Sequence, residues 1–479
     1  MSIGRSALSA VWIPAFAGTT VLAVLSVTGC ASPPTIVGSG AMPLEALFTV
    51  TAANERSVVR AIARASQCPE IVWGDGARAT MQVRAQPATV PLRGDGAQSD
   101  GKPAVFDVLT CEADWVTVAT RATVAGQAVP APRKAIRRIV LIGDTGCRMK
   151  ASDNAFQACN DNLLWPFAEV ARSAAALKPD LVVHVGDIHY RESPCPDGNK
   201  ACAGSPWGYG FDAWQADLFT PAAPLLAAAP WVFVRGNHES CFRAGQGWFR
   251  FIDAAPLMTE RTCDSTALDA IADFSEPYAV PVGHGNQFII FDSSKSSGKT
   301  YAVTDPAYRN YVSQVQKVAT LADAAQHSFF LSHHPLLAFA PGKKDADAKP
   351  GGSQGLQSAF ASAYPQRLFP DKVSVLMHGH IHLFEAMSFS TAHPASVVLG
   401  NSGSANEGRA PAQVSLGTAA YPGALVEDYV ARSEYGFATL DKVDDGNASH
   451  WLLTEYDTQG TPVIICEIRD SKSRCSSLS

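Results

Sequence analysis

From residue 136 onward, short apolar runs alternate with longer amphipathic segments. Each short run predicts a buried strand. Apolar residues at helical spacing predict helices within 161–180 and 305–325, the second with Asp305 as N-cap and Pro306 in the first position. Strands that alternate with helices indicate an α/β domain with a largely parallel sheet. The predicted strands lie at 136–143, 181–186, 231–236, 288–294, 328–335 and 373–380.

Residues 45–135 have a different pattern and predict a small N-terminal accessory domain, either α+β or rich in strands. A helix is expected near 55–66, with short strands after it. The sequence VPAPRKA at 129–135 is typical of a linker. The segment contains no motif with recognisable chemistry, so function is expected in the larger domain, residues 136–479.

Residues 1–29 are typical of a secretory signal peptide, because Arg5 precedes a mostly apolar stretch that ends in small residues. The sequence V-T-G-C that ends at Cys30 resembles a bacterial lipobox, which predicts cleavage before Cys30 and lipidation of that cysteine. A plain secretory signal with a chance cysteine is the alternative. Residues 30–44 are small and polar and predict a tether. We therefore expect an exported, membrane-anchored lipoprotein that faces the periplasm or the cell surface.

The overall composition is that of a globular protein, with 47% hydrophobic and 17% charged residues and a net charge of −6. No basic run or aromatic-basic stripe occurs, which argues against a nucleic-acid surface. Ten cysteines follow Cys30, and an even number in an exported chain predicts disulfides, with sequence neighbours as plausible pairs. The sequence leaves the oligomeric state open.

Polar residues recur just beyond the ends of the predicted strands. In an open α/β sheet, ligands bind beyond the carboxyl ends of the strands, so these positions point toward one crevice. Each motif alone also fits a turn, a helix cap or a buried, hydrogen-bonded histidine. In chain order the motifs are GDTG (143–146), GDIHY (186–190), GNHE (236–239), HHP (333–335) and HGHIH (378–382).

This ordered set resembles the calcineurin-like metallophosphoesterase superfamily, and the tyrosine of the second motif makes it most similar to the purple acid phosphatase branch. Through its motifs the resemblance covers about residues 136–400. It implies a four-layer α/β/β/α sandwich, in which two packed β-sheets are flanked by helices. It also implies two metal ions at the sheet edge and the activity of a metal-dependent phosphoric ester hydrolase.

Carried over by position, the resemblance implies two sets of metal ligands that share one carboxylate. The first metal would be bound by Asp144, Asp187, Tyr190 and His382, and the second by Asp187, Asn237, His333 and His380. His238 binds neither metal and stands over the substrate. His378, His189 and His334 are expected to be buried or to lie behind the ligands.

The donor types favour different metals at the two sites. Many members of the superfamily have a histidine where this chain has Gly146, and Tyr190 can replace that missing ligand. Two carboxylates and a phenolate are hard anionic donors, which favour Fe(III) at the first site. Two imidazoles, an amide oxygen and the shared carboxylate carry less charge and suit divalent Zn, Fe or Mn at the second site.

The implied reaction is attack of a metal-bound hydroxide on phosphorus, with His238 as general acid and Asp187 as the bridge between the metals. The expected substrate is a small phosphate ester, hydrolysed in the manner of an acid phosphatase. A phosphodiesterase or a pyrophosphate hydrolase on the same core is the alternative. A metal-binding surface lipoprotein without catalysis is a third reading.

The walls of the pocket are less well defined by the sequence. A long insertion, residues 190–214, follows the second motif, and cysteine pairs 147–159, 195–202 and 241–263 would each tether a loop beside a motif. Some side chains near the motifs are candidates for substrate contact, although ordinary packing is the better interpretation for each. These candidates are Arg148, Arg191, Trp207 and Tyr209.

Overall fold

The computed structural model describes residues 43–93, 101–341, 348–406, 408–411 and 414–478. The expected signal peptide, Cys30 and most of the expected tether lie outside these residues. Residues 41–479 form one compact unit.

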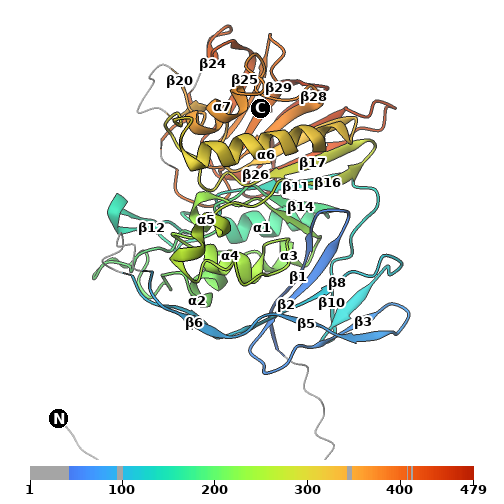
Figure 1. Ribbon diagram of the computed structural model, residues 1–479, viewed down its shortest axis with the longest axis vertical. Helices are drawn as coiled ribbons and strands as arrows, with labels where there is room; N and C mark the ends of the chain where they lie inside the picture. Colours follow the sequence, from blue (N-terminus) through green and yellow to red (C-terminus); the bar gives the residue numbers. More distant parts are fainter. Residues whose placement is uncertain (1–42, 94–100, 342–347, 407, 412–413, 479) are drawn as a thin grey trace, which may run out of the picture. The chain divides into compact units, whose positions relative to one another are not determined.

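Two large mixed β-sheets make up the centre of this unit (Figure 1). The described strands of the first sheet are, in order, β29 (Lys472–Ser477), β28 (Pro462–Arg469), β27 (Trp451–Asp457), β26 (Gly436–Lys442), β11 (Arg138–Ile142), β14 (Leu181–His184), β15 (Trp231–Phe233), β1 (Leu44–Thr51), β2 (Ser57–Ala63), β8 (Leu109–Asp114) and β5 (Gln82–Ala85). Those of the second sheet are β16 (Tyr278–Gly283), β17 (Asn286–Phe291), β18 (His327–Ser332), β21 (Val373–His378), β23 (Ala395–Leu399), β22 (Phe384–Phe389), β25 (Ala424–Arg432) and β24 (Ala419–Tyr421).

Smaller elements surround these sheets. A four-stranded sheet has the order β10 (Gln127–Ala128), β9 (Ala122–Val124), β3 (Glu70–Trp73) and β4 (Arg78–Thr80) among the described residues. Short two-stranded pairs are β6 (Ala88–Val90) with β7 (Ala104–Phe106), β12 (Met149–Lys150) with β13 (Ala155–Phe156), and β19 (Phe339–Ala340) with β20 (Lys349–Pro350).

All six predicted strands are present, as β11, β14, β15, β17, β18 and β21. They form two parallel groups, β11, β14 and β15 in the first sheet and β17, β18 and β21 in the second. Val140, for example, pairs with Val182, and Phe330 pairs with Leu376. The strand pattern predicted a largely parallel sheet, and that holds only within these two groups, because antiparallel strands flank both of them. The apolar runs predict buried strands well, but they do not say how many sheets share those strands.

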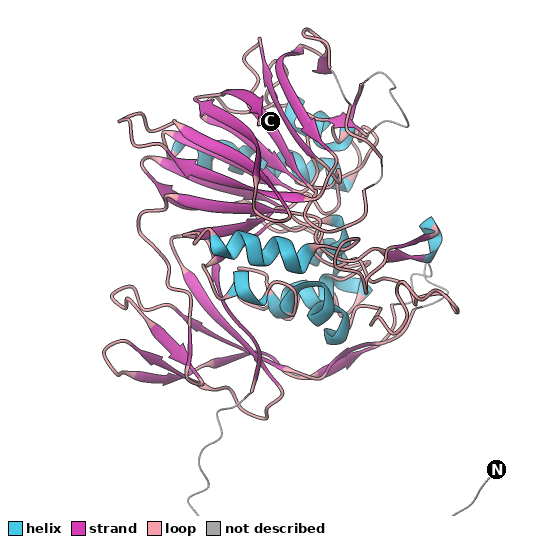
Figure 2. Cartoon of the chain, turned by 180° about the vertical axis from the view of Figure 1, so that it is seen from behind, coloured by secondary structure: helices cyan, strands magenta, loops and turns pink. Residues whose placement is uncertain are grey.

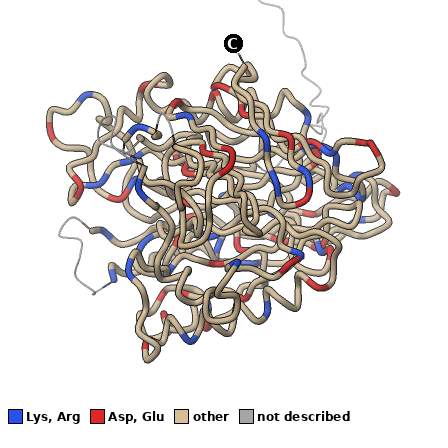
Figure 3. Tube along the Cα trace, turned by 90° about the horizontal axis from the view of Figure 1, so that it is seen from above, with Lys and Arg blue, Asp and Glu red and all other residues tan. Residues whose placement is uncertain are grey.

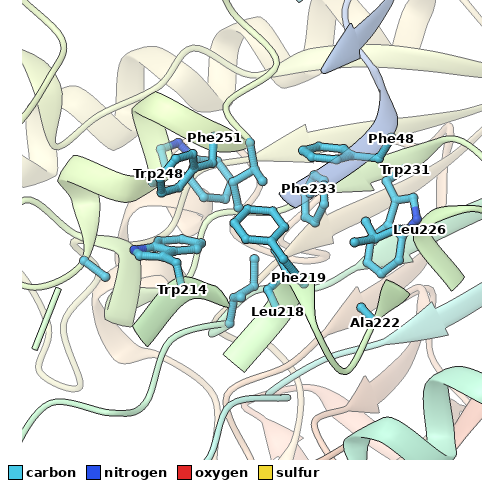
Figure 4. Packing of buried hydrophobic residues seen from close by; sticks show 14 of the residues in the cluster. Phe48, Trp214, Leu218, Phe219, Ala222, Leu226, Trp231, Phe233, Trp248 and Phe251 are labelled. Carbon is cyan, nitrogen blue, oxygen red and sulfur yellow. The ribbon is translucent and has the colours of Figure 1, made fainter. Parts of the chain in front are cut away.

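The layers follow from where the apolar side chains pack. Residues from both sheets, such as Leu141 and Val183 on one side and Phe288 and Phe329 on the other, form a common core between the sheets. A second core lies on the outer face of the first sheet, under α1 (Phe167–Ala176), α2 (Phe211–Trp214), α3 (Ala223–Leu226) and α4 (Gly245–Phe251). Figure 4 shows aromatic side chains of this core, in which the Phe251 ring packs edge-on against both Trp214 and Phe219.

The outer face of the second sheet is covered by α6 (Pro306–Asp323) and α7 (Gln354–Ala361), whose buried residues join a third core (Figure 2). The predicted start of α6 is confirmed, since the Asp305 side chain accepts a hydrogen bond from the Ala307 amide and Pro306 is the first helical residue. The four-layer α/β/β/α sandwich is therefore present.

The segment near 55–66 is a strand, β2, so the predicted helix is wrong. All seven residues of β2 are buried, because both faces of the strand pack into cores: Ile62 joins the core under α1–α4, and Val59 and Ala61 join another core with Ile71 and Trp73. A strand covered on both faces has apolar residues at consecutive positions, which can be mistaken for a helical pattern. Val58 and Val59 are β-branched and favour the extended form.

The first sheet also continues across the domain boundary that the sequence predicts near residue 135. Strand β1 pairs in parallel with β15, with Val50 opposite Trp231. Four strands that precede the predicted linker, β1, β2, β8 and β5, therefore belong to the same sheet as β11 and β14.

Five disulfides connect cysteines that are neighbours in the sequence: 68–111, 147–159, 195–202, 241–263 and 466–475. The three predicted pairs beside the motifs are among them. Disulfides at this density indicate an extracellular environment. Within the described part of the chain, no helix is long and apolar enough to cross a membrane. Figure 3 shows acidic and basic positions interspersed along the described chain.

Candidate metal centre

The five motifs follow the carboxyl ends of five central strands. Asp144 follows β11, and Asp187 follows β14. Asn237 and His238 lie in a short 3-10 turn (Asn237–Glu239) that begins four residues after the end of β15. The HHP motif follows β18 and the HGHIH motif extends from the end of β21, so both sheets contribute to one site.

The backbone is unusual at three of the predicted ligands. Asp144, Asp187 and His380 have φ values of 52°, 55° and 70°, in the left-handed region that non-glycine residues rarely occupy. Backbone conformations of this kind cost about 1–3 kcal/mol each and cluster at active sites. Gly236 permits the close approach, because a Cβ there would lie 2.1 Å from Oδ1 of Asp187.

The predicted ligands of the first metal converge on the Tyr190 hydroxyl. This oxygen lies 2.9 Å from Oδ1 of Asp144, 3.1 Å from Oδ2 of Asp187 and 2.8 Å from Nε2 of His382. Nδ1 of His382 donates to the carbonyl of Ala405 at 2.6 Å, which directs Nε2 toward the cluster. A histidine held in this way at one nitrogen has the other nitrogen available for a metal.

The predicted ligands of the second metal lie next to the first set and share Asp187. Ligand atoms of Asp187, His333 and His380 all lie within 4.8 Å of one another. Nδ1 of His333 donates to the carbonyl of Val185 at 3.0 Å, and its Nε2 lies 3.0 Å from Oδ2 of Asp187. Oδ1 of Asn237 is buried and has no hydrogen-bond partner among the described residues.

These features fit bound cations. A buried amide oxygen without a partner is costly, and a metal ion can satisfy it. Burial, reinforced by the carboxylates of Asp144 and Asp187, raises the pKa of the Tyr190 phenol well above its ordinary value. A phenolate at this position therefore requires a nearby positive charge, which a metal ion supplies.

Two buried carboxylates that the sequence analysis did not single out support the ligand loops from behind. The Glu239 carboxylate accepts hydrogen bonds from the amides of Gly236, Asp187, Ile188 and His189, at distances between 2.8 and 3.1 Å. Burial, with Asp187 nearby, raises the pKa of Glu239 to about 7. Glu239 is the last residue of the GNHE motif, so its place in that motif could have identified it from the sequence.

Asp217, the second of these carboxylates, lies in a π-helical segment (Gln215–Phe219) outside every motif. It accepts hydrogen bonds from the amides of Cys147 at 3.0 Å and Tyr190 at 2.8 Å, which joins the first two motif loops. It also binds the Arg191 side chain at 2.7 Å. No sequence signal distinguishes Asp217 from other helical aspartates.

The remaining histidines lie outside the set of converging side chains. His378 is buried with Nδ1 3.0 Å from the Ser332 hydroxyl, and burial lowers the pKa of its imidazole to about 3. His334 lies against the ring of His380, with ring centroids 4.2 Å apart. His189 is buried behind the site, and neither ring nitrogen has a hydrogen-bond partner among the described residues.

His238 lies over the Tyr190 ring, with centroids 3.9 Å apart. Its Nδ1 donates to the carbonyl of His189 at 2.8 Å, and its Nε2 lies 2.7 Å from Nη2 of Arg243 and 3.7 Å from Oδ2 of Asp187. Because a guanidinium can only donate, Nε2 is the acceptor in this arrangement. Arg243 was not identified from the sequence.

Most of the wall candidates have structural partners. Arg148 pairs with Asp153 at 2.9 Å, and Arg191 is buried over the Trp165 ring. Trp207 is covered by the Lys102 ammonium, 4.7 Å from the ring centroid. Tyr209 donates to Glu192 at 3.1 Å and so reaches the surroundings of His238.

A family model described as Calcineurin-like phosphoesterase matches residues 137–384, just over half of the chain. Among solved structures, the chain is similar to the purple acid phosphatase PPD1 from yellow lupin (Lupinus luteus) seeds, with 16% identity, a TM-score of 0.51, and coverage of 90% of this chain and 74% of that chain.

The chain is also similar to PhoD, with 12% identity, a TM-score of 0.52, and coverage of 92% of this chain and 93% of that chain. At these identities the two structures show a common fold. A sequence search of curated proteins gave no match.

Proposed function

Because the chain belongs to the calcineurin-like phosphoesterase family and is thus a metallophosphoesterase, we propose that it hydrolyses small phosphate monoesters at the cluster around Tyr190. The observation that carries this proposal is that six of the seven predicted ligands come together around Tyr190 and Asp187 from both sheets, with His238 beside them and assigned to neither metal.

The family implies a dinuclear metal centre, and the donor set supports an assignment for each metal. We assign Fe(III) to Asp144, Asp187, Tyr190 and His382, because three of these donors are anionic oxygens when ionised. Divalent Zn, Fe or Mn is assigned to Asp187, Asn237, His333 and His380. When bound, two metal ions supply an activated nucleophile and positive charge for the phosphoryl oxygens.

The side chains of the chain itself bind, orient and transfer protons. Asp187 presents Oδ2 toward His333 and Tyr190 and accepts the His238 amide at Oδ1, which suits a bridging carboxylate. His238 is held by the His189 carbonyl at Nδ1, so Nε2 faces the cluster. In the proposed reaction Nε2 carries a proton and donates it to the leaving oxygen.

Export and anchoring belong to the same proposal. The disulfides support an extracytoplasmic site of action, and the lipobox supports anchoring through a lipid on Cys30. A metallophosphoesterase held there would meet phosphate esters outside the cytoplasm.

The central test compares His238→Ala with Asp187→Asn on two phosphate monoesters, one alkyl and one activated aryl. A basic alkoxide needs a proton to leave and a phenolate does not, so His238→Ala should cost about 10²–10⁴-fold on the alkyl ester and less on the aryl ester. Metal content should be unchanged. Asp187→Asn should lose metal and activity on both esters.

Other outcomes would point to other functions. Equal losses on both esters for His238→Ala, with metals retained, would reject the acid role. Faster hydrolysis of diesters or of pyrophosphate by the wild-type protein would replace the monoesterase assignment. A metal-loaded protein that hydrolyses no phosphate ester would be a binding protein.

A further inference from the structure

Arg243 lies at the rim of the metal centre, between Glu192 and His238. Its Nε donates to Oε2 of Glu192 at 2.9 Å, and its Nη2 contacts both Oε1 of Glu192 and Nε2 of His238, the latter at 2.7 Å. We propose that Arg243 binds a non-reacting phosphoryl oxygen of the substrate. This inference rests on the proposed function and adds a recognition residue that none of the motifs contains.

The position of Arg243 places its guanidinium within reach of a phosphoryl group. Nη2 touches Nε2 of His238, and that nitrogen is 3.7 Å from Oδ2 of Asp187, the carboxylate at the centre of the cluster. The imidazole of His238 therefore lies between the Arg243 guanidinium and Asp187, the carboxylate predicted to bridge the two metals. A phosphoryl group seated there can present one oxygen to His238 and another to Arg243.

Arg243 also has hydrogen-bonding capacity to spare. A guanidinium has five N–H donors, and Glu192 occupies only the Nε edge and one face of Nη2. Nη1 has no hydrogen-bond partner among the residues that the structure describes. The donor that faces His238 can be transferred to a phosphate oxygen, which is a stronger, charged acceptor.

Glu192 holds Arg243 in place for this contact. The carboxylate is itself fixed by the Tyr209 hydroxyl at 3.1 Å and lies 3.2 Å from Nδ1 of His238. Both side chains of the pair are largely covered, with Arg243 11% and Glu192 5% exposed, so the guanidinium is oriented before a ligand arrives. An oriented charge loses little entropy on binding.

The hydrogen bond between Arg243 and His238 also links phosphate binding to proton donation by His238. In the described arrangement Nε2 of His238 accepts a hydrogen bond from Arg243, which is unsuited to proton donation. When a phosphoryl oxygen takes over the Arg243 donor, Nε2 is free to take up a proton from solvent, which it then presents to the leaving group. Phosphate binding and exposure of Nε2 are thus linked through one guanidinium.

The test measures binding of inorganic phosphate to metal-loaded protein by calorimetry, beside KM and kcat for an aryl monoester. Arg243→Met should weaken phosphate binding and raise KM by about 10- to 100-fold, the usual effect of losing a charged hydrogen bond, with metal content unchanged. Arg243→Lys should give a phosphate affinity and a KM between those of the wild type and of Arg243→Met, because lysine keeps the positive charge but lacks the forked donor geometry of a guanidinium. The control is Arg172→Met. Arg172 is an exposed arginine on α1 that pairs with Glu169, so this variant should have the phosphate affinity and KM of the wild type.

Arg243→Met leaves the Glu192 carboxylate without its main partner, so the double variant Glu192→Gln with Arg243→Met removes that charge as well. It should bind phosphate as weakly as the single variant. Wild-type phosphate affinity in either variant, with metals retained, would overturn the inference, as would a wild-type protein that binds no phosphate.

The calorimetric arm separates this inference from the proposed function. If the wild-type protein binds phosphate but hydrolyses no ester, the proposed function fails. Arg243→Met then still decides the binding role, because weaker binding supports it and unchanged binding rejects it.

Discussion

Arg84, on β5, connects the N-terminal strands to the segment that follows the GNHE turn. Its guanidinium donates to the carbonyl of Phe249 at 3.0 and 2.7 Å, of Ala255 at 3.0 Å and of Asp253 at 3.2 Å. It also pairs with Glu112 at 2.9 Å. These carbonyls lie at the end of α4 and just beyond it, where a helix leaves its last carbonyl groups without intrahelical partners.

The cost of Arg84→Met follows from which groups lose a partner. Arg60 donates to the Asp253 carbonyl at 2.8 Å and contacts Glu112 at 3.1 Å. In Arg84→Met, the Asp253 carbonyl and the Glu112 carboxylate therefore each keep one arginine partner. The carbonyls of Phe249 and Ala255 lose the charged donor that Arg84 provides. At about 1–3 kcal/mol for each of the two groups, we expect the free energy of unfolding to fall by about 2–6 kcal/mol.

Chemical denaturation with the disulfides intact measures this change. The control is Arg78→Met on β4, whose ion pair with Glu70 is exposed on both sides and should contribute less than about 1 kcal/mol. If Arg84→Met unfolds at the same denaturant concentration as Arg78→Met, the carbonyls of α4 do not depend on β5, and the reasoning fails.

Three further predictions concern separate parts of the chain. Iron-loaded wild-type protein should show a visible charge-transfer band that Tyr190→Phe abolishes, and colourless wild-type protein in both redox states would reject Fe(III) at the first site. Burial raises the pKa of Glu385 to about 8, above its unfolded value of about 4.5, so its contribution to stability is complete below pH 4.5 and is lost as the pH rises to about 8. Glu385→Gln should flatten the pH dependence of the unfolding midpoint in that window, and an unchanged slope would contradict this. Cys30→Ala should release the protein from membranes or block its processing, whereas wild-type protein found only in the soluble fraction would exclude the anchor.

The sequence predicted the central strands because each is a short apolar run bounded by a polar motif. It failed at β2, where buried residues lie at consecutive positions and Arg60 interrupts them. The charge of Arg60 is satisfied by Glu112 and by carbonyls more than 190 residues away in the chain, such as that of Asp253. Local periodicity contains no information about such partners.

The candidate site shows the same limit. The predicted ligands could be identified because each directly follows a strand, and the ends of neighbouring parallel strands meet. Glu192 and Arg243 lie outside the motifs, two residues beyond Tyr190 and five beyond His238. They meet only because β14 and β15 are adjacent, which brings the loops after these strands together.

The pairing of β1 with β15 gives the N-terminal segment a role that its composition does not suggest. Strand β15 has three residues, all buried, and the turn of the GNHE motif begins four residues after its end. Without β1, this short apolar strand would be the edge of the sheet and would expose unpaired backbone groups. The N-terminal strands cover that edge, and Arg60 and Arg84 hold the carbonyl groups at the end of α4. The loop that presents Asn237, His238 and Arg243 is therefore supported at both ends by residues that come before the first motif.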